Sequence, residues 1–143
     1  MSKQREILII GTYGIDIFHG IIEEMERHQY LTFTTTSHAI ALEYLQNRRF
    51  DAIIINLEPD GRGGVAESEL LLSIADAPMQ SQAICLGVSA HYPHSLPQDS
   101  ESKHLKILAG WLTLPVKPAV LANHILKLIE SDHPLTVKDK LDA

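Results

Sequence analysis

The 143-residue sequence contains one cysteine, and aromatic residues make up only 6 % of it. A single cysteine cannot form an internal disulfide or a multi-cysteine zinc site, so Cys85 favours a reducing compartment and is expected to be a small buried hydrophobe. Uninterrupted apolar runs reach four or five residues, whereas a membrane span needs about 20. The first residues lack the apolar stretch of a secretory signal. We therefore expect a cytoplasmic protein without a membrane segment.

Positive charge is also scarce, because 12 Lys and Arg stand against 18 Asp and Glu, a formal net charge of -6. This balance argues against direct nucleic-acid binding, which needs a basic face. Arg48 and Arg49 form a basic pair that a solvated helix end explains. The length predicts one domain, which we assign to residues 1–130, followed by a polar tail or linker over residues 131–143.

Short apolar segments alternate with helical patterns along the chain. The expected strands are 7–10, 31–36, 50–55, 83–88 and a segment within 105–114. The first expected helix has apolar residues at 15, 18, 22 and 25, and the second follows an N-cap at Ser37. A third spans 65–77, and the last runs from Pro118 to about 129. The segment 92–103 is expected to be a loop or a weak helix. The third strand lacks alternation, which indicates burial on both faces. The pattern predicts an α/β fold with a mostly parallel sheet covered on both sides.

Four segments stand out in order and spacing: Ala-Leu-Glu-Tyr-Leu at 41–45, the run from Phe50 to Leu57, Val-Ser-Ala-His at 88–91 and Trp-Leu-Thr-Leu-Pro-Val-Lys-Pro at 111–118. Together they resemble the receiver domain of bacterial response regulators. The resemblance covers about residues 5 to 130. It implies a flavodoxin-like (βα)5 doubly wound sheet with strand order 2-1-3-4-5 and a site where the first and third strands end. Gly11 and Asn56 would then face each other across that crevice.

Receivers phosphorylate an aspartate at the end of the third strand, using an acidic pair with Mg²⁺, a hydroxyl and a lysine. The matching positions here are Asn56 for the aspartate, Gly11 and Thr12 for the acidic pair, Ser89 for the hydroxyl and Leu114 for the lysine. An amide is a poor nucleophile and forms no stable acyl phosphate, and the Gly-Thr pair brings no carboxylate for the metal. The resemblance therefore implies a pseudo-receiver that cannot be phosphorylated: a non-enzyme without metal or cofactor.

Three alternatives stay open at this point. In another register, Lys117 and Pro118 would supply the Lys-Pro pair of the fifth strand. A working phospho-receiver would need a different acceptor, for which the nearby acidic residues are Asp51, Glu58 and Asp60. A small neutral or anionic ligand could instead bind the Gly11–Gly14 loop, which lies between a strand and a helix.

A crevice without this chemistry moves any regulatory role to protein contacts. The usual partner surface of receivers maps here to about residues 99–129, with Trp111 at the position of the family's switch aromatic. The helix after Pro118 has more apolar residues than one packed stripe needs. We therefore expect Trp111, Val120 and Leu128 to face a protein partner or an output domain of the same chain, with a homodimer through the fifth strand and fifth helix as the simplest form. The expected function is that of a regulatory module in two-component-type signalling.

Overall fold

The computed structural model describes residues 5–11, 19–57, 65–80, 83–89, 110–113 and 117–130. Within these ranges the chain forms five strands, four α-helices and one 3-10 turn. The strands are β1 (Glu6–Ile10), β2 (Leu31–Thr35), β3 (Ala52–Asn56), β4 (Ile84–Ser89) and β5 (Gly110–Thr113). The helices are α1 (His19–Arg27), α2 (His38–Asn47), α3 (Val65–Asp76) and α4 (Pro118–Glu130), and the 3-10 turn is η2 (Pro78–Gln80).

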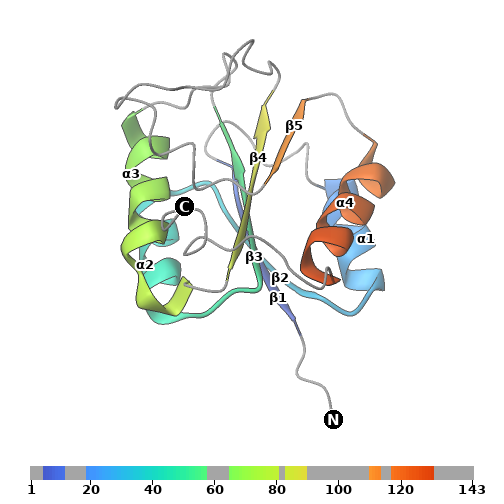
Figure 1. Cartoon of the computed structure of the whole chain (residues 1–143), viewed down its shortest axis with the longest axis horizontal. Coiled ribbons are helices and arrows are strands. Elements are labelled where there is room, and N and C mark those ends of the chain that lie inside the picture. The colour runs from blue at the N-terminus through green and yellow to red at the C-terminus, as the bar shows by residue number, and fades with distance from the viewer. Residues whose placement is uncertain are drawn as a thin grey trace.

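The strands form one sheet in the order β2-β1-β3-β4-β5, and all neighbouring strands are parallel. This confirms the expected flavodoxin-like strand order. Helices α2 and α3 cover one face of the sheet, and α1 and α4 cover the other (Figure 1). The expected loop or weak helix at 92–103 and the tail at 131–143 lie outside the described residues.

Alternate residues of the central strands supply two cores, one on each face of the sheet. Leu8 and Ile10 of β1 pack with residues of α2 and α3, whereas Ile7 and Ile9 pack with residues of α1 and α4. All five residues of β3 are buried, as its lack of alternation predicts. Burying one large aliphatic side chain stabilises a fold by roughly 1.5–3 kcal/mol, so β1 and β3 are held firmly from both sides.

Local signals explain where most elements begin and end. Ser37 caps α2 as predicted, because its Oγ accepts the Ile40 N–H at 3.2 Å. β2 ends one residue earlier than expected, since Thr35 Oγ1 accepts the Ser37 N–H at 3.0 Å and the chain turns into this cap. β3 begins at Ala52 rather than Phe50, because the Phe50 N–H donates to the side chain of Gln80 and not to a neighbouring strand.

The buried face of α1 includes both predicted residues that the structure describes, Ile22 and Met25, and adds Ile21. Ile21 and Met25 are buried, and Ile22 is half-buried against the same core. Ile15 and Phe18, which the prediction included, lie outside the described residues. The face is broader than a single stripe because α1 packs both on the sheet and along α4.

Candidate functional site

The carboxyl ends of β1, β3 and β4 lie side by side at one end of the parallel strands. Ile10 pairs with Ile55, so Gly11 and Asn56 each follow directly after a paired residue. Asn56 in turn pairs with Val88, and Ser89 follows as the last residue of β4. The register therefore brings the backbones of Gly11, Asn56 and Ser89 to neighbouring positions, as expected from the resemblance.

Asn56 and Gly11 are both buried at these strand ends. The Asn56 residue is 6 % exposed. The Gly11 N–H donates to the Thr35 carbonyl at 2.9 Å, so this amide belongs to the sheet and is not directed at a ligand. That bond weakens the idea of a phosphate-binding loop beginning at Gly11, whereas Thr12 to Gly14 lie outside the described residues.

Negative charge is missing from the described strand ends. Gly11, Asn56 with the following Leu57, and Ser89 carry no carboxylate. Across the described ranges, no group of three or more His, Cys, Asp or Glu side chains is arranged to hold a metal ion. Three other candidates, Thr12, Glu58 and Asp60, lie outside these ranges, as does Leu114, and for Ser89 only the backbone is described.

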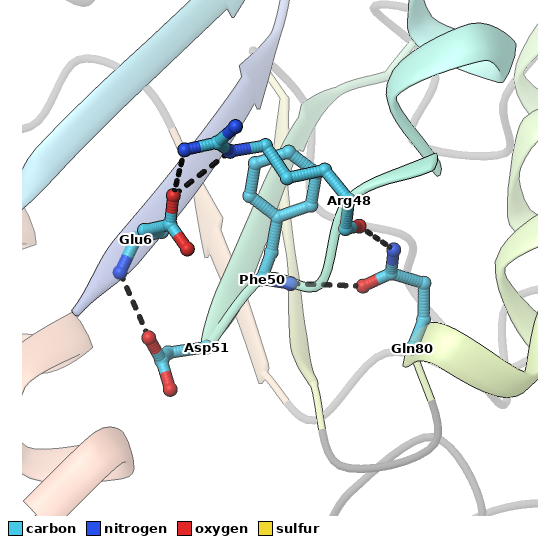
Figure 2. A network of polar contacts seen from close by, with 5 residues as sticks. All are labelled: Glu6, Arg48, Phe50, Asp51 and Gln80. Atoms are coloured by element: carbon cyan, nitrogen blue, oxygen red, sulfur yellow. Dashed lines mark hydrogen bonds and ion pairs between the residues drawn. The ribbon is translucent and has the colours of Figure 1, made fainter. Parts of the chain in front are cut away.

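Asp51, one of the alternative phosphoacceptors, lies at the opposite, amino-terminal end of β3. It precedes β3, whereas Asn56 is the last residue of that strand. Five strand residues span about 16 Å at roughly 3.3 Å per residue. The Asp51 carboxylate accepts the Glu6 N–H at 2.8 Å, where β1 begins (Figure 2). This carboxylate is therefore unsuited to chemistry beside Asn56.

Lys117, the lysine of the alternative register, is exposed and lies directly before α4. Its carbonyl accepts the N–H groups of Val120 and Leu121 at 3.0 and 3.1 Å, so its backbone starts the helix. The choice between the two registers stays open, because Leu114 is not described.

A polar brace at the amino ends of the strands was missed by the sequence analysis. It consists of Glu6, Arg48, Phe50, Asp51 and Gln80 (Figure 2). Arg48 Nε donates to Glu6 Oε1 at 2.8 Å, and Nη2 contacts the same oxygen. The fully buried Gln80 accepts the Phe50 N–H at 3.2 Å and donates to the carbonyls of Leu45 and Arg48 at 2.9 and 2.5 Å. Arg48 does lie at a helix end, as predicted, because it is the C-cap of α2, but its side chain is also bound to Glu6.

The predicted partner surface lies on β5 and on the helix predicted as the fifth, which is α4 here, and the structure describes only part of it. Val120 is 52 % exposed, as expected for a surface residue. Leu128 is half-buried against the core between α4 and α1, and Leu121 and Ile125 are fully enclosed there. The apolar patch on α4 is narrower than the sequence predicts, because α1 covers much of the excess. Trp111 pairs through its backbone with Gly87 in β4, and its side chain is not described.

Cys85 lies in the middle of β4 and is fully buried, as predicted. Burial raises the pKa of its thiol from an ordinary 9.0 to about 12. The cysteine is consequently a packing residue and not a reactive thiol.

No protein-family model and no curated protein sequence matches this chain. Solved structures do resemble it. The receiver domain (CheY-like) of a response regulator from Methylobacillus flagellatus has a TM-score of 0.68 and 22 % identity, covering 90 % of this chain and 100 % of that one. Chemotaxis response regulator CheY4 of Vibrio cholerae has a TM-score of 0.68 and 20 % identity, covering 87 % and 98 %. The chain has the CheY-like receiver fold.

A third structure with the receiver fold contains a bound metal. The receiver domain of sensor histidine kinase PA1611 from Pseudomonas aeruginosa PAO1, at 21 % identity, 90 % and 100 % coverage and a TM-score of 0.64, has a magnesium ion coordinated in its active site cleft. In a receiver fold, the switch point between β1 and β3 is where ligands bind, and here Gly11 and Asn56 occupy it. Among the described helices, none is long and apolar enough to cross a bilayer.

Proposed function

We propose that this chain is a cytoplasmic regulatory module of a bacterial two-component-type system that binds proteins and does not accept a phosphoryl group. The observation that carries the proposal is Asn56 at the carboxyl end of β3, 6 % exposed and flanked by strand ends without carboxylates. The neutral amide offers no carboxylate oxygen for an acyl phosphate. The chain is therefore a pseudo-receiver rather than an enzyme.

The described residues at these strand ends are poorly suited to Mg²⁺. This ion prefers oxygen ligands and is usually held in proteins by one or two carboxylates. Asn56 can offer one neutral carbonyl oxygen, and Gly11 has no side chain. Restoring only the aspartate would leave a buried negative charge without its cation.

The direct test is phosphorylation by a small donor. The chain is incubated with acetyl phosphate and Mg²⁺, and its intact mass is measured. We expect no phosphoryl adduct. An adduct that disappears on substitution of Glu58 or Asp60 would show that the acceptor has moved and would overturn the proposal.

The variant Asn56→Asp tests the metal site separately. We expect it to remain unphosphorylated and to be less stable than the wild type at neutral pH, because its carboxylate would be buried without a partner cation. Adding Mg²⁺ should leave its urea midpoint unchanged, whereas a working site would raise the midpoint with metal concentration. Efficient labelling of this variant, or a clear Mg²⁺ effect, would contradict the account of the crevice.

Val120 on α4 tests the proposed partner surface. With no phosphorylation chemistry in the crevice, association with a protein partner or an output domain is expected to use β5 and α4. Val120→Glu should weaken such association without loss of cooperative unfolding. The matched control is Leu72→Glu, because Leu72 is 50 % exposed on α3, across the sheet. Equal binding by both variants would show that this surface is not used.

A further inference from the structure

Among the described strands, β2 lies at an edge of the sheet, since its one strand partner there is β1. The Leu31 N–H donates to the Arg5 carbonyl at 2.8 Å, and the Thr35 carbonyl accepts the Gly11 N–H at 2.9 Å. In a parallel ladder, alternate residues direct both backbone groups to the same neighbour. Leu31, Phe33 and Thr35 therefore face β1, whereas Thr32 and Thr34 direct their N–H and C=O groups away from the sheet.

This edge lacks the features that usually protect one. Exposed edge strands commonly carry a charge, a proline or a bulge that blocks further pairing. β2 reads Leu-Thr-Phe-Thr-Thr and pairs with β1 in regular register over all five residues, without a bulge. Leu31 is 39 % exposed and Thr34 is also exposed. An uncharged, regular strand rich in β-branched residues is a template for another strand.

We propose that β2 is a self-association edge, and that its occupant is β2 of a second copy of this chain in antiparallel orientation. A two-fold axis at Phe33 places Thr32 opposite Thr34 of the second copy, and Thr34 opposite Thr32 of that copy. Both residues direct their backbone groups outward, so each opposed pair exchanges two hydrogen bonds, as antiparallel pairs do. The strand is thus complementary to itself over its whole length.

The side chains favour this register. Phe33 lies on the axis and faces its counterpart, and its ring is already fixed by Tyr44 and Phe50, with centroid distances of 5.6 and 5.8 Å. A residue that is ordered beforehand loses little conformational entropy on association. Opposed Thr pairs and aromatic pairs also stabilise neighbouring strands.

The charge near this edge is neutralised within each copy. The Arg48 guanidinium lies 4.3 Å from the Phe33 ring centroid and is bound by Glu6. Two copies therefore bring together two ion pairs rather than two free cations. Because one short strand buries far less than a standard interface, the dimer is weak and depends on protein concentration.

Sedimentation equilibrium of the full chain over a wide concentration range tests the edge. We expect a reversible dimer whose association constant falls at least about tenfold in Thr34→Lys, since the lysine charges the edge. Gln46→Lys, which adds the same charge at an exposed site on α2, is the matched control and should dimerise like the wild type. Urea unfolding shows whether each variant is folded.

The proposed surface on β5 and α4 is distinguished by the variant Val120→Glu, which should leave this dimer unchanged. In hydrogen exchange, the Thr32 and Thr34 amides should gain protection as the concentration rises. A wild type that stays monomeric up to about millimolar concentration, where association free energies near -4 kcal/mol become visible, would overturn the proposal. So would a dimer that persists in Thr34→Lys or is lost in Val120→Glu.

Discussion

Replacement of Gln80 by Met tests how much the polar brace stabilises the fold. Gln80 is fully buried and makes three hydrogen bonds through its side-chain amide. The carbonyl of Leu45 is one of the last in α2 and would otherwise lack a helical partner. Gln80→Met keeps nearly the same volume, so the change removes polar contacts without opening a cavity.

The expected loss follows from the groups left behind. The variant leaves the Phe50 N–H and the carbonyls of Leu45 and Arg48 without the hydrogen-bond partner that Gln80 supplies. Each buried polar group without a partner costs about 1–3 kcal/mol. Arg48 is partly exposed, so water relieves some of this cost. We expect a loss of about 3–5 kcal/mol in the free energy of unfolding, a large part of the 5–15 kcal/mol typical of a domain.

Urea unfolding followed by far-UV circular dichroism measures this loss. The midpoint should fall while the slope of free energy against urea stays the same, because the folded and unfolded surfaces are unchanged. Met79→Gln is the control: Met79 is adjacent, 40 % exposed, and its change should shift stability by less than about 0.5 kcal/mol. A loss below about 1 kcal/mol for Gln80→Met would refute the reasoning, since that is no more than one ordinary hydrogen bond contributes.

Three further changes test other parts of the fold. Ser37→Ala removes the acceptor for the Ile40 N–H and should cost about 1 kcal/mol in urea unfolding, whereas Ser37→Asp should retain most of it. Gln29 has a φ of 68°, so Gln29→Gly should raise stability by about 0.5–1 kcal/mol, and Gln29→Ala should not. The pKa of the Cys85 thiol is about 12 in the folded protein against 9.0 for an exposed thiol, so the unfolded chain loses this proton first as the pH rises. The free energy of unfolding should therefore fall by about 1.4 kcal/mol per pH unit between those two pKa values. Cys85→Ala should lack that component, and an identical pH slope in both proteins would contradict it.

The sequence predicted the parts of the fold that depend on periodicity. The burial of β3 and the Ser37 cap are confirmed, because each depends on residues that are close together in the sequence. The strand order, which the resemblance to receiver domains implied, is confirmed as well. The brace was not predictable in this way. Its members Glu6, Arg48 and Gln80 are far apart in the chain and meet only after the strands and helices have packed.

The apolar residues of α4 show the same limit in predicting the partner surface from the sequence. Composition alone cannot tell an apolar residue that meets another helix from one that meets a partner. Leu128 lies against the core shared with α1, whereas Val120 is exposed, and both were predicted for the same surface. The backbone positions of Gly11 and Asn56 were easier to predict, because the end of each strand and the residue type at that end are visible in the sequence. Thr12 and Leu114 lie outside the described residues.

The strand order also has a consequence for synthesis on the ribosome. β1, β2 and β3 emerge first and can form a three-stranded sheet in which β3 is the unfinished edge. β4 and then β5 add to that side in the order in which they are translated. The nascent sheet therefore grows in one direction, and each new strand covers the hydrogen-bonding edge left by the previous one, which shortens the time that a growing edge is open to aggregation.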